Sequence, residues 1–197
     1  MEITSAHLNN PQMDMDWSGA CPRCSAGARP IPPMSMSSFK MGKKRIDLTG
    51  YAHLLILERS LAEELDAAGL SGLTHHPIRV GRDADSFVWS EVQHTLPPAE
   101  PGSVLDRRGR CDRCGRGGHA LRASRRDGRT VVTPLSLTYT AAALAGARDV
   151  NDGGERFFPL GGAAGGGYAP LVISARAQAF FAACGLRHLS FREISIV

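Results

Sequence analysis

Four of the five cysteines fall into two Cys-x-x-Cys pairs, a spacing that places two thiols on one tight turn. Cys21 and Cys24 form the first pair, in CPRC, and Cys111 and Cys114 form the second, in CDRC. Two such turns together supply the four thiolates of a closed, tetrahedral zinc site. The four cysteines therefore predict one structural Zn²⁺ ion. Because four thiolates leave no open coordination position, we expect this site to hold the fold and not to catalyse a reaction.

The residues around the pairs leave alternatives to a four-thiolate site. The thiols could be plain reduced side chains. A redox-active pair needs a helix N-terminus that lowers its thiol pKa, whereas both pairs lie in turns rich in glycine and arginine. His119 could replace one cysteine as a ligand, although we expect a surface histidine there. Gly115 follows the second pair, where backbone amides turn back toward sulfur; Ser25 stands at the matching position of the first and is expected to weaken that half.

Common catalytic motifs are absent from the sequence. It contains no G-x-S-x-G, H-E-x-x-H or G-x-G-x-x-G, and the glycine tract at 161–167 lacks the lysine of a phosphate-binding loop. His75 and His76 are neighbours on an expected strand, so their side chains point to opposite faces and cannot bind one ligand. Cys184 lies in an apolar helical stretch and is expected in the core. We therefore expect a protein that is not an enzyme.

The elements that must position the cysteines form an internal repeat. Residues 51–56 (YAHLLI) match 168–173 (YAPLVI), and 67–73 (AAGLSGL) match 183–189 (ACGLRHL). Each copy is expected to be a strand, a helix, a Gly-Leu-x-x-Leu segment and a second strand, and each follows one cysteine pair. Zinc binding by all four cysteines would then join the two copies.

Local signals set the expected helix ends. Ser60, with Glu63 three residues later, is typical of a helix N-cap, and Ser174 is the expected N-cap of the second helix. Gly69 and Gly185 are the expected C-cap glycines, because glycine adopts a left-handed conformation at little cost.

The expected fold class is α+β, with pseudo-symmetric strand-helix-strand units joined by a zinc-ribbon-like four-cysteine site. We expect a single domain over residues 1–197, with repeat units at about 21–80 and 111–197. Strands are expected at 73–80, 130–132 and 189–197, a short helix around 140–148, and loop-rich linkers at 30–42, 97–110 and 151–167.

Length and composition agree with one globular domain. The chain has 197 residues, of which 43% are hydrophobic and 21% charged. No apolar run approaches the roughly 18 residues that a membrane span requires, and the first twenty residues carry no signal-peptide pattern. A reducing cytoplasmic location is therefore expected, which also favours metal over disulfide for the cysteine pairs.

Basic charge is concentrated around the second cysteine pair. The segment 106–129 contains nine arginines and three aspartates, although the whole chain has a net charge of only +4. Such a patch could bind the phosphates of a nucleic acid or an acidic protein surface. The segment lacks the interleaved aromatic residues of a single-strand platform. The arginines of this patch are Arg107, Arg108, Arg110, Arg113, Arg116, Arg122, Arg125, Arg126 and Arg129.

These motifs together resemble the double-CXXCG motif proteins, a paralogous family found mainly in myxobacteria and their neighbours. The resemblance covers the chain from about Cys21 to Val197, and its C-terminal motif is the most specific part. The chain departs from the family pattern at Ser25 and in the long glycine-rich segment 161–167. The matching residues are the two cysteine pairs, Ile46-Asp47-Leu48, the segment from Leu65 to Leu73, and Phe180, Gly185, Leu186, Leu189 and Phe191-Arg192-Glu193.

The resemblance implies a binding function. Some members of that family are regarded as immunity proteins, which neutralise polymorphic toxins of the swarm-inhibition type. By this resemblance the chain is expected to be a cytoplasmic, non-catalytic inhibitor that binds a cognate toxin domain. Two alternatives stay open: a zinc-ribbon protein that binds nucleic acid through the arginine patch, and an accessory subunit of an enzyme complex.

Overall fold

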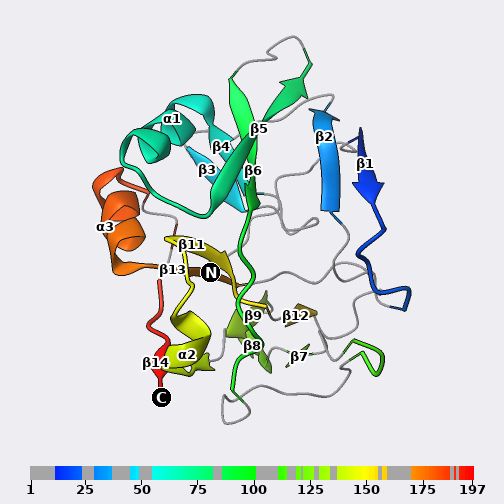
Figure 1. Cartoon of the computed structure of the whole chain (residues 1–197), viewed down its shortest axis with the longest axis vertical. Coiled ribbons are helices and arrows are strands. Elements are labelled where there is room, and N and C mark those ends of the chain that lie inside the picture. The colour runs from blue at the N-terminus through cyan, green and yellow to red at the C-terminus, as the bar shows by residue number, and fades with distance from the viewer. Residues whose placement is uncertain are drawn as a thin grey trace.

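The computed structural model shows a mixed α+β protein with a core made mainly of sheet and few helices (Figure 1). Among its described residues, no helix has the length and apolar character needed to cross a membrane. The structure describes residues 12–23, 29–36, 45–48, 55–81, 86–100, 111–114, 119–120, 122–126, 129–133, 137–154, 157–158, 170–186, 189 and 191–197.

The largest sheet has six strands in the spatial order β1-β2-β5-β6-β4-β3. Strands β2 and β5 pair in parallel, and the other neighbours are antiparallel. The helix α1 follows β4 directly. The bounds are β1 Gln12–Asp16, β2 Arg29–Met36, β3 Ile46–Leu48, β4 Leu55–Glu58, α1 Arg59–Ala67, β5 Leu73–Val80 and β6 Phe87–Val92.

Alternation along β4 and β6 divides the core between two faces of this sheet. On one face, α1 and α3 (Ala175–Ala183) cover the sheet, as Figure 1 shows. The side chains of that cluster include Leu55, Leu57 and Val88 from the sheet. On the other face, Ile56 and Trp89 pack with residues of β2 and β5, whose buried members are Met34, Met36, Ile78 and Val80.

The segment 30–42 was expected to be a loop-rich linker, but its first part forms β2. The prolines suggested a loop, because proline removes a backbone donor from a sheet. The alternation of the residues that follow decides the structure: Met34 and Met36 are buried, while Ser35 between them is only partly buried. Strand β2 thus has an inward face at period two despite its prolines. Residues 37–42 lie outside the described part of the chain.

The start of α1 differs from the sequence expectation. The N-cap is Glu58 and makes no side-chain capping bond, so the prediction of Ser60 as N-cap is wrong. The hydroxyl of Ser60 instead accepts a hydrogen bond from the Nη2 atom of Arg45 at 3.1 Å. Arg45 also forms ion pairs with Glu58 and Glu64. This ion-pair cluster supports the first turn of α1 in place of a capping box.

The two helices α1 and α3 end in the same way. Gly69 and Gly185 have φ angles of 64° and 68°, as the C-cap prediction requires. The amide of Leu70 donates to the carbonyl of Leu65, and the amide of Leu186 donates to that of Phe181. Both pairs span five residues, which is the longer bond of a Schellman motif. The N-cap of α3 is Ser174, as predicted, and its hydroxyl accepts from the amide of Ala177 at 3.1 Å.

The second repeat unit departs from the first after its helix. Of the described residues in the expected strand 189–197, only Ser195–Ile196 forms a strand. The short helix expected at 140–148 is Ala141–Leu144, and the expected strand at 130–132 is present as Arg129–Thr133. The two units share a strand, a helix and a helix end. Duplication of the entire unit stays a prediction, as does the single-domain organisation.

The remaining strands form small two-stranded ladders outside the six-stranded sheet. The expected linker 151–167 contributes to two of them. These ladders are β7 His119–Ala120 with β12 Phe157–Phe158, β8 Arg122–Arg126 with β9 Arg129–Thr133, β10 Thr138–Tyr139 with β14 Ser195–Ile196, and β11 Val150–Asp152 with β13 Leu171–Ile173; the helix α2 is Ala141–Leu144.

One aspartate links the end of α1 to the start of α3. The carboxylate of Asp149 accepts hydrogen bonds from the amide and hydroxyl of Ser71, just after α1, at 2.9 and 3.0 Å. It also accepts from the hydroxyl of Ser174, the N-cap of α3, at 2.7 Å. Arg176 lies 3.6 Å from the same carboxylate and donates to the carbonyl of Ala68 at the end of α1. The contact between α1 and α3 is therefore polar as well as hydrophobic.

Candidate metal centre

Cys21 lies in the connection between β1 and β2. The chain turns sharply after β1: the amide of Ser18 donates to a carboxylate oxygen of Asp16 at 2.8 Å, and the amide of Ala20 donates to the carbonyl of Trp17 at 3.0 Å. Cys21 follows this turn and is only 8% exposed. The antiparallel pairing of β1 with β2 thus fixes both ends of the loop that carries the first cysteine pair.

Cys111 and Cys114 lie on one turn, as the Cys-x-x-Cys spacing predicts. Cys111 is 9% exposed, and Cys114 is the more exposed of the two. Among the described residues, Cys21, Cys111 and Cys114 form no disulfide. The turn therefore presents one buried thiol and one thiol nearer the surface.

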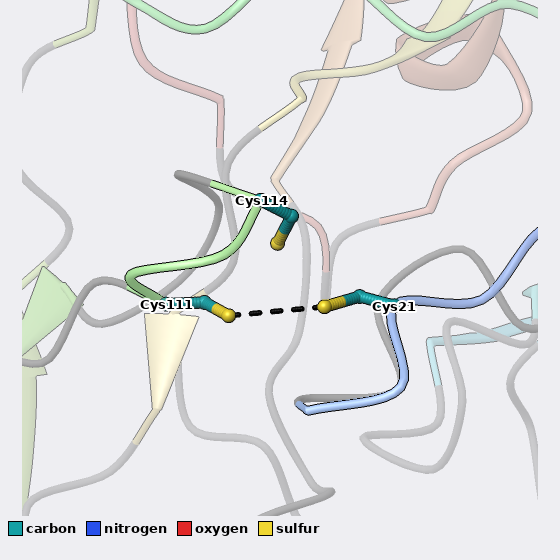
Figure 2. A group of neighbouring side chains, drawn as sticks. All are labelled: Cys21, Cys111 and Cys114. Carbon is teal, nitrogen blue, oxygen red and sulfur yellow. Dashed lines mark hydrogen bonds between the residues drawn. The ribbon is translucent and has the colours of Figure 1, made fainter.

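The structure brings Cys21, Cys111 and Cys114 together, with their Sγ atoms all within 4.8 Å of one another. Figure 2 shows the Sγ atoms of Cys21 and Cys111 facing each other, and that of Cys114 directed toward the space between them. The first two sulfur atoms are 3.8 Å apart. A disulfide would require about 2.05 Å. Four sulfurs arranged tetrahedrally around zinc, each about 2.3 Å from the metal, have edges of about 3.8 Å. Three cysteines could thus bind one metal ion.

Cys24, the fourth predicted ligand, lies outside the described residues. The same holds for Ser25 and Gly115, so the predicted weakening of the first turn by Ser25 stays a prediction. The spacing still places Cys24 three residues after a cysteine that belongs to the cluster. A fourth thiolate at this centre therefore stays a prediction from the sequence.

An ion pair connects the two cysteine turns outside the sulfur cluster. The Nε atom of Arg23 lies 3.0 Å from a carboxylate oxygen of Asp112. The two side chains are 68% and 66% exposed, so this pair contributes little free energy, about 0–1 kcal/mol. Sequence analysis missed the contact. The only signal is that CPRC contains an arginine and CDRC contains an aspartate, beside an arginine of its own.

The nine arginines of the patch are only partly placed. Arg113 lies on the second cysteine turn and is exposed, while Arg107, Arg108, Arg110 and Arg116 lie outside the described residues. The backbone of the β8–β9 hairpin carries the other four. Its register places Arg126 opposite Arg129 and Arg125 opposite Thr130, so three of these arginines belong to one end of the hairpin.

Two other residues that the sequence singled out are His119 and Cys184. The backbone of His119 belongs to β7, so its role as an alternative ligand stays a prediction. Cys184 packs against the hydrophobic cluster beneath α1 and α3, though it is half-buried, which differs from the buried position expected. Burial and the nearby carboxylate of Glu64 raise the pKa of the Cys184 thiol. Cys184 is thus a weakly reactive packing residue.

His75 and His76 point to opposite faces of the sheet, as predicted. The Nδ1 atom of His75 is 2.7 Å from the hydroxyl of Ser90, and its Nε2 atom is 3.4 Å from Asp66. His76 stacks on Trp89 with ring centroids 4.4 Å apart. Both rings are largely covered, since the two side chains are only 13% and 21% exposed. Burial lowers the pKa of His75, with Asp66 acting against this shift.

Comparisons with known proteins do not assign the chain to a family. No family model, no curated protein and no solved structure matches it.

Proposed function

We propose that Cys21, Cys24, Cys111 and Cys114 bind one structural Zn²⁺ ion. The observation that supports this most is the 3.8 Å between the sulfurs of Cys21 and Cys111, which equals about one edge of a zinc-tetrathiolate tetrahedron. The third described thiol lies within 4.8 Å of both. Thiolate ligands favour zinc over hard cations such as Mg²⁺ and Ca²⁺.

A centre of this kind is expected to act as a clasp, that is, a metal site that joins two distant parts of the chain. Cys21 belongs to the loop next to the six-stranded sheet, whereas Cys111 and Cys114 precede the second repeat unit. Metal binding would therefore close a long loop, and its free energy would contribute to folding. With four thiolates around the ion, no position is left for a substrate or an activated water.

We further propose that the protein is a non-catalytic binding module, an immunity protein that neutralises a cognate toxin. This rests on the resemblance to the double-CXXCG motif proteins. The concentration of arginine around the second cysteine pair also supports a role in recognition, because a charged patch steers association with a partner of opposite charge.

Metal analysis of matched variants tests the clasp. The protein is expected to contain about one zinc per chain, and Cys114→Ser to lose most of it. Cys184→Ser is the matched control, because that thiol packs under the helices and is not part of the sulfur cluster. Zinc retained by Cys114→Ser, or lost equally from Cys184→Ser, would contradict the proposed ligand set.

Co-expression tests the immunity proposal separately. The product of the adjacent gene is produced in a host cell with and without this protein. Growth arrest that is relieved by this protein, together with a purified one-to-one complex, would support it. If the neighbouring product is harmless and no complex forms, immunity is wrong whatever the metal content.

A nucleic-acid-binding function is the second candidate, because the β8–β9 register collects Arg125, Arg126 and Arg129 at one end of a hairpin. Binding of this kind neutralises phosphates and weakens steeply with salt. A gel-shift assay with duplex DNA and single-stranded RNA at low salt tests it. A shift that disappears with added salt would favour this candidate, and the absence of any shift at low salt would rule it out.

A further inference from the structure

The two cysteine turns share an outer face beside the sulfur cluster. Pro22 and Arg23 from the first turn and Asp112 and Arg113 from the second line one shallow hollow of about 530 Å³. The hollow therefore exists only where two segments far apart in the sequence come together. Its lining is polar and charged, unlike the apolar lining of a small-molecule pocket.

The charges of this hollow are unevenly matched. Arg23 is held by its ion pair with Asp112, at 3.0 Å, yet its side chain stays 68% exposed. Arg113 is exposed, and within the described part of the chain no carboxylate pairs with it. One positive charge is thus left over. Asp112 orients the first guanidinium, while the second is available to a new anion.

An exposed aromatic side chain comes shortly before the first cysteine turn in the sequence. Trp17 is 56% exposed, although tryptophan is usually well buried. It precedes Cys21 by four residues, and the turn between them keeps their Cα atoms closer than about 14 Å, the length of four extended residues. Tryptophan and arginine are the residues most enriched among those that dominate binding at protein interfaces.

We propose that the knuckle face, which is the hollow lined by Pro22, Arg23, Asp112 and Arg113, binds an acidic segment of a protein partner that also reaches Trp17, four residues before Cys21. A carboxylate of the partner pairs with Arg113, and an apolar side chain of the partner covers Trp17. The inference rests on the proposed function in one respect: the metal keeps the two turns, and hence the face, assembled.

The charge balance favours a carboxylate over a nucleic acid. A planar guanidinium matches one carboxylate in a bidentate pair. A phosphate backbone presents a run of negative charges, and Asp112, within the hollow, repels such a run. The four described lining residues carry one net positive charge, which is sufficient for a single carboxylate but weak for a polyanion.

Fluorescence anisotropy with two labelled probes tests the knuckle face. The probes are the peptide (Glu-Glu-Leu)₃ and a single-stranded oligothymidylate of similar charge, and the full-length protein is used after its zinc content has been measured. The zinc-loaded protein is expected to bind the peptide more tightly than the oligonucleotide. Arg113→Glu and Arg23→Glu are each expected to weaken peptide binding about tenfold or more.

Arg79→Glu is the matched control. Arg79 is exposed and lies opposite Ser35, near the end of β2 that is farthest from Arg29 and the first cysteine turn. Six residues of strand separate Arg29 from Ser35, about 20 Å. Peptide affinity is expected to be unchanged in this variant. All three variants alter exposed side chains and should retain zinc and thermal stability.

The outcomes separate the face from the metal clasp. Zinc-loaded protein that does not bind the peptide, or that loses affinity equally in Arg79→Glu, overturns the knuckle face and leaves the clasp intact. Tighter binding of the oligonucleotide that depends on Arg113 also overturns it, in favour of nucleic acid. Protein that contains no zinc but binds the peptide through Arg113 refutes the clasp and the metal dependence of the face.

Discussion

Replacing Asp149 by asparagine is expected to lower the free energy of unfolding by about 2 kcal/mol. The side chain is only 12% exposed, and its carboxylate accepts three hydrogen bonds from Ser71 and Ser174. Asparagine has the same shape but no charge. Hydrogen bonds to a charged group contribute about 1.5–3 kcal/mol each and neutral ones about 0.5–1.5, so the loss is about 1 kcal/mol for each of two or three bonds.

Alanine at the same position should cost more, about 3 kcal/mol, because the amide of Ser71 then loses its acceptor. Urea unfolding at neutral pH with excess zinc measures both variants. Asp14→Asn is the control, since Asp14 is an exposed residue of β1. If Asp149→Asn and Asp14→Asn differ by less than about 0.5 kcal/mol, the claim that this carboxylate joins the end of α1 to the start of α3 is wrong.

The pH dependence of this effect has a definite sign. Burial raises the pKa of Asp149, but hydrogen bonds from Ser71 and Ser174 and the charge of Arg176 lower it, and the lowering prevails. The stabilisation is therefore complete above the unfolded-state pKa of about 3.9 and is lost as pH falls through the lower folded-state value. The difference between wild type and Asp149→Asn should shrink below about pH 4.

Three further perturbations test other parts of the account. Cys114→Ser should lower the free energy of unfolding of the whole protein by about 3 kcal/mol or more, because the free energy of metal binding contributes to folding. The control Cys184→Ser, at a half-buried cysteine, should cost about 1 kcal/mol. Burial lowers the pKa of His75, so its contribution is present above about pH 6.5 and is lost as pH falls; His75→Gln should remove that slope. Gly72→Ala should cost about 3 kcal/mol or more, since its φ is 102° and a Cβ would lie 2.1 Å from the carbonyl oxygen of Val150. Gly185→Ala, with open space at its Cβ, should cost only about 1 kcal/mol.

Chemical unfolding followed by circular dichroism measures each of these variants. Equal stability of Cys114→Ser and wild type, with and without a chelator, would contradict the clasp. The slope of the free energy of unfolding against pH corresponds to about one proton for this ring. If His75→Gln keeps the wild-type slope between pH 5 and 7, burial of the ring does not affect stability. Equal costs at Gly72 and Gly185 would show that the close approach to Val150 does not matter.

The sequence predicted the features that depend on local chemistry. Cysteine spacing identified the thiols that gather at the centre, although Cys24 lies outside the described residues. The Gly-Leu pattern identified both helix ends, since a left-handed residue there needs glycine. Ser174 was recognised as an N-cap for the same kind of reason: its hydroxyl satisfies an amide of its own first turn.

Features that depend on contacts across the chain were missed. Three prolines concealed β2, which is held by β1 on one side and β5 on the other. Ser60 fits the local pattern of an N-cap, but its hydroxyl bonds to Arg45 instead. The local pattern could not predict this bond, because the two residues are far apart in sequence. Nothing local to Asp149 marks it as the link between the end of α1 and the start of α3, because its partners lie 78 and 25 residues away. Contacts between distant segments thus determine the local structure where local propensity is ambiguous.

The most direct test of the central claim is the zinc content of the purified, full-length protein, measured by plasma mass spectrometry alongside titration of its thiols. We expect about one zinc per chain, with the four cysteines of the two pairs protected until a chelator is added. Less than about half an equivalent of zinc, with these four thiols reacting freely, would contradict it.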